Sequence, residues 1–181
     1  MDGGLTISTE RGGVAAARGR PVRALYTPEQ RRRRDATRWT LVQGILAPVQ
    51  FLVFAVSVVL VLRSLLTGDG VLAAHISIIV KTVLLYTIMV TGAIWEKVVF
   101  GQYLFAEAFF WEDVVSFVVI ALHTIYLGGL LTGRLSTQAL LLVALSAYAV
   151  YVVNAVQFVL KLRAARLQEA HDAARRIAEP A

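Results

Sequence analysis

Acidic and aromatic side chains gather in one stretch of the sequence, between Trp95 and Asp113. The stretch holds seven of the chain's 17 aromatic residues, and its four acids and one lysine give a local charge of −3 in a chain of net charge +6. Two carboxyl groups in different surroundings can divide the work of general acid and general base, because an apolar wall keeps one protonated. The alternative is an interfacial aromatic belt with acids that simply face water. The candidates for acid–base chemistry are Glu96, Glu107, Glu112 and Asp113.

The elements that must position these acids are membrane-spanning helices. The chain has 181 residues, of which 57% are hydrophobic, and its mean hydropathy is +0.67. A soluble domain of this size cannot bury so much apolar surface. We therefore predict an all-α fold, an integral membrane four-helix bundle. Its parts are a disordered basic N-terminal tail at 1–25, a membrane domain at 26–167 with spans at about 42–62, 74–94, 114–132 and 140–160, and a frayed C-terminal tail at 168–181.

Basic residues flank the predicted spans and indicate the topology. Nine of the 18 Lys and Arg residues precede Leu41 and five follow Leu160, so both termini and the acidic stretch are expected on the cytoplasmic side. Thr27, Pro28 and Gln30 have the pattern of a capped helix start, which predicts a juxtamembrane helix running to about Trp39. Contact with anionic lipid explains the pI near 10.1, so no nucleic-acid partner is expected.

Two ionisable residues lie inside the predicted spans. Lys81 belongs to the second span and His123 to the third, and neither is part of a metal-binding motif, so we predict no metal site of the protein's own. Glu112, Ser116 and His123 share one helix face, although Glu112 and His123 stand about 16 Å apart along the axis. Lys81 can extend to the membrane interface, pair with a carboxylate or contact an anionic group of a substrate, and His123 can bond to a neighbouring helix or contact a ligand. The sequence leaves these interpretations open.

Amide side chains mark the first and fourth spans. Gln50 follows Pro48, which can kink a helix and free a carbonyl group, so Gln50 is the amide of its span with the strongest claim to a ligand contact. The fourth span carries a polar ribbon, with members three or four residues apart. The ribbon consists of Tyr148, Tyr151, Asn154, Gln157 and Lys161.

Three long segments of unusual sequence carry a family resemblance. They are LYTPEQRRRRDATRWTLVQGILAPVQFLVF, YTIMVTGAIWEKVVFGQYLFAEAFFWEDVVSFVVIALHT and AYAVYVVNAVQFVLKLRAARL. Over about residues 25–167 the chain resembles the vinyl bacteriochlorophyllide hydratase family of bacteriochlorophyll biosynthesis. The resemblance implies a hydro-lyase of the bacterial inner, intracytoplasmic photosynthetic membrane. It would add water across the 3-vinyl group of a chlorophyllide-type macrocycle to give a 3-(1-hydroxyethyl) group. No redox cofactor is implied, and the magnesium is carried by the substrate.

Such a substrate suggests roles for the candidate residues. Hydration needs a proton donor, a positioned water and a base, for which the four acids are candidates and Glu112 the leading one. The flat macrocycle would bind between aromatic side chains. Its magnesium would accept an axial ligand, such as neutral His123, and its propionate would pair with a lysine. The residues predicted to bind substrate are His123, Trp95, Trp111, Phe110, Lys97, Lys81, Gln50 and Asn154, with Lys161 a further partner for the propionate.

Two other functions compete with hydration. A non-catalytic pigment-binding or photosynthetic assembly protein would use the same walls but needs no convergent carboxylates. A small transporter or structural membrane subunit would use the polar ribbons, but the sequence has no internal repeat of the kind common in transporters. The expected partners are a tetrapyrrole, water and the lipid membrane, while an oligomer or a complex with other enzymes of pigment biosynthesis stays open.

Overall fold

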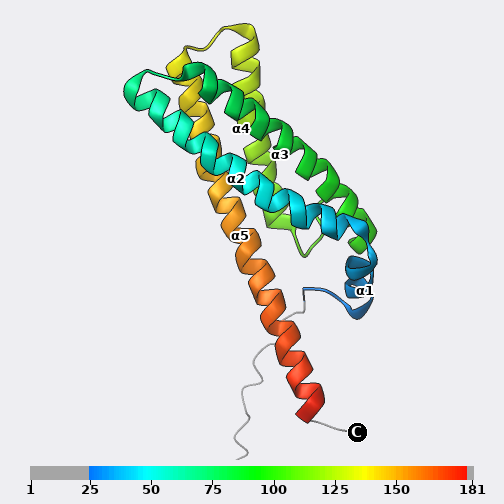
Figure 1. Cartoon of the computed structure of the whole chain (residues 1–181). Coiled ribbons are helices and arrows are strands. Elements are labelled where there is room, and N and C mark those ends of the chain that lie inside the picture. Colours follow the sequence, from blue (N-terminus) through cyan, green and yellow to red (C-terminus); the bar gives the residue numbers. More distant parts are fainter. Residues whose placement is uncertain (1–24, 179–181) are drawn as a thin grey trace, which may run out of the picture.

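The computed structural model describes residues 25–178, and the regular secondary structure of this part of the chain is helix alone (Figure 1). The all-α prediction is confirmed, whereas the tail predicted at 1–25 lies outside the described residues except for Leu25. The helices are α1 (Pro28–Ala36), α2 (Arg38–Thr67), α3 (Val71–Phe100), α4 (Phe110–Thr132) and α5 (Thr137–Ala178).

Four of these helices are long and apolar enough to cross a membrane. They are α2, α3, α4 and the part of α5 from Thr137 to His171, and each contains one predicted span. Short turns join α2 to α3 and α4 to α5, and each pair packs together as a helical hairpin. Large apolar side chains such as Leu52, Val90 and Val153 are more than half exposed on the outer faces. These faces are suited to lipid, because a soluble protein would not leave them uncovered.

The juxtamembrane segment differs from the prediction at its end. The capping box at Thr27 is confirmed, since the Gln30 N–H donates to Thr27 Oγ1 (3.2 Å) and the Thr27 N–H donates to Gln30 Oε1 (2.8 Å). The prediction of one helix to about Trp39 is wrong, because Thr37 adopts an extended conformation and separates α1 from α2. Pro48 lies inside α2, which continues through it to Thr67.

Helix α5 continues past the bundle to Ala178, so the tail predicted at 168–181 is helical as far as Ala178, and residues 179–181 lie outside the described residues (Figure 1). Glu169 lies in this extension, and its Oε1 is 3.1 Å from Arg34 Nη1 and 3.7 Å from Arg31 Nε. These ion pairs join α5 to α1. The end of the bundle that holds α1 and the loop of residues 101–109 is called the loop end below; the turns at residues 68–70 and 133–136 form the opposite end.

Candidate active site

Three of the four predicted acids meet at the loop end. Glu96 lies in the last turn of α3, and Glu112 and Asp113 lie in the first turn of α4; each is at most 5% exposed. Glu96 and Asp113 are neighbours, because they accept hydrogen bonds from the adjacent backbone N–H groups of Ala106 and Phe105. Two buried carboxyl groups side by side favour a shared proton, since like charges oppose the ionisation of both. The structure therefore brings together a carboxyl pair beside a third carboxyl group.

The loop of residues 101–109 is held by the carboxyl pair. The Phe105 N–H donates to Asp113 Oδ2 (2.7 Å) and the Ala106 N–H donates to Glu96 Oε2 (3.2 Å). Phe105 has φ 59°, a left-handed conformation that is uncommon for a bulky residue and is found where the surroundings impose it. Glu96 and Asp113 thus have a structural task as well, since they fasten the loop that covers them.

Lys161 of α5 completes the group of charges. Its Nζ lies 2.5 Å from Glu112 Oε2 and also donates to the carbonyl oxygen of Ala108. Glu112 is the more buried partner, with 6% of its side chain exposed against 24% for Lys161. The ion pair joins α4 and α5 to the loop. It also gives Glu112 surroundings that differ from those of the Glu96–Asp113 pair.

An aromatic cluster lies between α1 and these acids. The Tyr26 ring stacks on Phe100 with a centroid separation of 5.7 Å, and Trp95 meets Phe100 and Phe109 edge to face. Phe158 of α5 stacks on Phe109 at 5.9 Å. These rings form a compact apolar cluster, of which Phe100 also lines the pocket described below.

Two predicted wall residues lie elsewhere. Phe110 and Trp111 are 43% and 66% exposed, and they pack against each other on the outer side of α4. Trp95 is therefore the single member of the predicted aromatic set that belongs to the cluster near the acids. Lys97 is also exposed, and its Nζ donates to the Gly101 carbonyl oxygen (2.8 Å), which caps α3.

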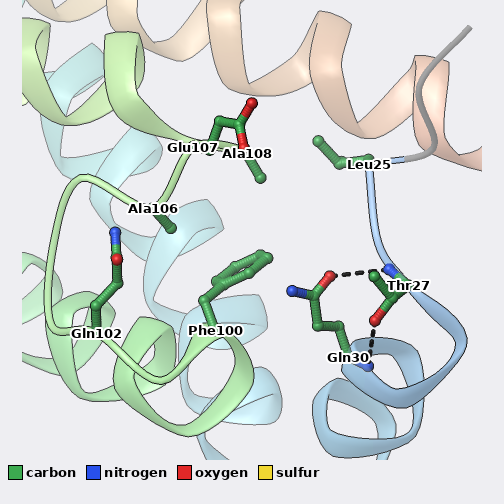
Figure 2. Close-up of a pocket in the computed structure, with 8 residues that line it drawn as sticks. All are labelled: Leu25, Thr27, Gln30, Phe100, Gln102, Ala106, Glu107 and Ala108. Carbon is green, nitrogen blue, oxygen red and sulfur yellow. Dashed lines mark hydrogen bonds between the residues drawn. The ribbon is translucent and has the colours of Figure 1, made fainter.

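A pocket of about 430 Å³ opens beside the acids, between the segment that leads into α1 and the 101–109 loop (Figure 2). Ala106, whose N–H bonds Glu96, lines it, and so does Ala108, whose carbonyl oxygen accepts from Lys161. The exposed Glu107 lines the pocket instead of joining the buried acids. The volume lies in the range of small-molecule sites. The other lining residues are Leu25, Thr27, Gln30, Phe100 and Gln102.

The remaining candidates lie in the interior of the bundle, away from the acids. Lys81 is fully buried, with Nζ 3.7 Å from the centre of the Tyr151 ring. His123 is also fully buried, and its Nδ1 lies 2.8 Å from the Val119 carbonyl oxygen. Helix geometry separates His123 from Glu112 by about 16 Å along α4. Gln50 and Asn154 are buried as well, and the Asn154 Nδ2 donates to Ser116 Oγ (2.8 Å).

Sequence reasoning missed several residues of the site. Tyr26, Phe109 and Phe158 reach the cluster from three different elements, and Lys161 was considered for a substrate carboxylate, not for Glu112. For Lys161 the sequence did carry a signal that it faces the interior, because this residue ends the polar ribbon of the fourth span. For Tyr26 no local pattern could have helped, because its partners Phe100 and Phe109 lie more than 70 positions away.

The four apolar helices define an integral membrane protein. Its buried carboxyl groups lie beneath a loop that they hold in place, and such a site is equipped for acid–base chemistry. Residues 26–164 match the family described as 2-vinyl bacteriochlorophyllide hydratase (BCHF), and the chain belongs to this family. The resemblance inferred from the three sequence segments is thus confirmed. The matched residues include all three buried acids and Lys161.

Two curated relatives carry the same description. The 2-vinyl bacteriochlorophyllide hydratase of Rhodobacter capsulatus is 69% identical over 150 residues, which cover 83% of this chain and 87% of the relative. That of Cereibacter sphaeroides is 71% identical over 148 residues, which cover 81% of this chain and 91% of the relative. No solved structure matches the chain.

Proposed function

We propose that this chain hydrates the vinyl group of a bacteriochlorophyllide-type macrocycle, and that the reaction takes place at the carboxyl groups of the loop end. The names of the two relatives support the reaction. The site is supported by one observation above all, the contact of Glu96 with Asp113 beside the ion-paired Glu112. A protein that only binds pigment needs aromatic walls but no convergent carboxyl groups for proton transfer. No electrons are exchanged in hydration, so the proposal requires no redox cofactor.

In this proposal the Glu96–Asp113 pair supplies the proton. Glu96 is the better donor, because Asp113 accepts the shorter backbone hydrogen bond, 2.7 Å against 3.2 Å, and so is the better stabilised carboxylate. The vinyl π electrons form the new C–H bond at the terminal carbon as the Glu96 O–H bond breaks. Positive charge is left on the carbon attached to the macrocycle, where conjugation spreads it. The neighbouring carboxylates stabilise this cation.

Glu112 acts as the base. A water molecule attacks the cationic carbon, and its proton passes to Glu112 as the C–O bond forms. Transfer of that proton back to the Glu96–Asp113 pair restores the starting state, so one water is consumed and no proton is gained or lost. Lys161 holds the Glu112 side chain in position through the ion pair. The 101–109 loop excludes other nucleophiles while the cation exists.

The rim of the macrocycle that carries the vinyl group approaches through the pocket of Figure 2. Ala106 forms the boundary, since it lines the pocket and bonds Glu96. Magnesium sits at the centre of the same ring, within half a macrocycle of the vinyl group. His123 lies about 16 Å from Glu112 along α4. The axial role for His123 stays a prediction, and the proposed reaction at the loop end does not require it.

We further propose that the loop end faces the cytoplasm from the intracytoplasmic photosynthetic membrane. The support is the positive charge of α1, which carries Arg31 to Arg34, compared with Arg63 and Arg134 near the opposite end. The chain has no cysteine, so single cysteines can be introduced as reporters. A membrane-impermeant maleimide should label Gln102→Cys from the cytoplasmic side and Asp69→Cys from the other side.

The direct test incubates membranes that contain the chain with a 3-vinyl chlorophyllide and no added cofactor. A product heavier by one water, with a blue-shifted long-wavelength band because the vinyl group leaves conjugation, is the expected result. Membranes without the chain are the control. Pigment retained without a change of mass would favour the pigment-binding alternative and refute the hydratase.

A further inference from the structure

Polar side chains continue from the acids into the interior of the bundle, and several of their buried atoms have no hydrogen-bond partner among residues 25–178. These atoms are Gln50 Nε2, Lys81 Nζ, His123 Nε2, Asn154 Oδ1 and Gln157 Oε1. An unpaired polar atom in an apolar interior costs free energy, and lipid offers no alternative partner. Five of them in neighbouring turns of four helices indicate a polar ligand inside the bundle.

The chemistry of these atoms identifies the class of ligand. The Gln50 amide nitrogen and Lys81 Nζ donate hydrogen bonds, whereas Asn154 Oδ1 and Gln157 Oε1 accept them. His123 is an acceptor too, because its Nδ1–H donates to the Val119 carbonyl oxygen and leaves the Nε2 lone pair available. An anion would satisfy only the donors, and a metal ion would be opposed by the lysine. Water both donates and accepts, and therefore fits the whole set.

On α5 the polar side chains form a series that reaches the acids. Asn154, Gln157 and Lys161 follow at intervals of three and four residues, so neighbours are about 4.5–6 Å apart along the axis. One water molecule spans that distance between two hydrogen-bonding groups. On the facing helix, Ser116 accepts from Asn154 and lies one turn from Glu112. The series ends at the Glu112–Lys161 ion pair.

We propose that the bundle interior binds a file of water molecules, from Lys81 and His123 past Asn154 and Gln157 to Glu112, and that this file supplies the water consumed in hydration. The supply role rests on the proposed function, whereas the water file does not. The physical reason is the route by which water can reach the acids. A macrocycle in the pocket covers the loop side of the acids, so the attacking water must come from the opposite side, which is the bundle interior.

The file can be tested without reference to activity, by X-ray-pulsed hydroxyl-radical labelling of the purified protein in lipid nanodiscs. Radicals formed from bound water label the side chains beside it. Tyr151, which lies against Lys81 and is 9% exposed, should be labelled, whereas Tyr26 of the aromatic cluster, which is 3% exposed, should not. Tyr103, which is 60% exposed, serves as the internal measure of the hydroxyl-radical dose. Labelling of Tyr151 no greater than that of Tyr26 would overturn the file.

The supply role is tested with Gln157→Leu, which removes an unpaired acceptor and breaks no hydrogen bond between described residues. We expect kcat to fall about tenfold, the worth of one hydrogen bond, with KM for the pigment unchanged. Gln157→Glu keeps an acceptor and should restore kcat. Ser146→Leu, at an exposed position of α5, is the matched control.

The outcomes separate the two proposals. Unchanged kcat in Gln157→Leu would overturn the supply role, even if Tyr151 is labelled. Labelling of Tyr151 in a wild-type protein that hydrates no vinyl pigment would uphold the file and refute the proposed function instead.

Discussion

Removal of the Lys161 ammonium group tests the charge arrangement of the site most directly. Lys161→Met keeps much of the apolar stem but leaves Glu112, whose side chain is 6% exposed, without its cation. Breaking a fully buried ion pair typically costs 3–5 kcal/mol. Because 24% of the lysine side chain is exposed, water screens part of the interaction, and we expect a loss of about 2 kcal/mol in the free energy of unfolding.

The partner substitution separates the ion pair from other effects. Glu112→Gln alone leaves the ammonium group of Lys161 with the Ala108 carbonyl oxygen as its partner in the site. The double variant Lys161→Met/Glu112→Gln has neither buried charge, so it should recover about 1–2 kcal/mol relative to the sum of the single variants. Unfolding in mixed micelles measures the stabilities. Hydration of a 3-vinyl chlorophyllide, followed by absorption and product mass, measures the activity.

The double variant should differ from wild type in activity more than in stability. Its stability should recover, but its kcat should stay about 10²–10⁴-fold below wild type, because the base is still missing. Additive stability losses would show that the contact between Lys161 and Glu112 carries no interaction energy. Near-normal hydration by Glu112→Gln would refute its role as the base.

Two further predictions concern the acid pair and the aromatic cluster. Glu96→Gln should lower kcat about 10²–10⁴-fold, whereas Asp69→Asn, which changes an exposed acid at the opposite end of the bundle, should leave kcat near wild type. If Glu96→Gln and Glu112→Gln both hydrate normally, the carboxylate mechanism is wrong. Burial raises the pKa of Tyr26 to about 12, so its contribution to stability is full below pH 10, its ordinary pKa, and is lost as the pH rises toward 12. Protease cleavage within α1 should therefore increase over that range in the wild type but not in Tyr26→Phe, and equal increases in both would contradict the assignment.

The fold was largely predictable because its signals are local. Apolar segments of about 20 residues, the capping box at Thr27 and turn sequences between spans each act within a few turns of helix. One difference arose where distant contacts decide, since the extension of α5 beyond residue 168 is joined to α1 by Glu169, Arg31 and Arg34. The break at Thr37 is instead local, because the Thr37 side chain caps the start of α2.

The candidate site was predictable in composition but not in arrangement. A concentration of acids and aromatics is visible in the sequence, yet residues next to each other in a helix point about 100° apart. Trp111 therefore faces outward while Glu112 is buried, although they are adjacent. In the loop, Ala106 bonds Glu96 whereas Glu107 lines the pocket. Sequence spacing does not report which way a side chain turns in an irregular loop.

By itself, the sequence determined that this chain is a four-span helical membrane protein, and it carried the resemblance that places it in its family. Composition and helical periodicity suffice for the first, since a bilayer admits few ways to satisfy the hydrogen bonds of a polar backbone. Tertiary structure decided which carboxyl groups are neighbours and which one meets Lys161, 49 positions away. Charge partners depend on helix packing, which brings together residues that no local pattern connects.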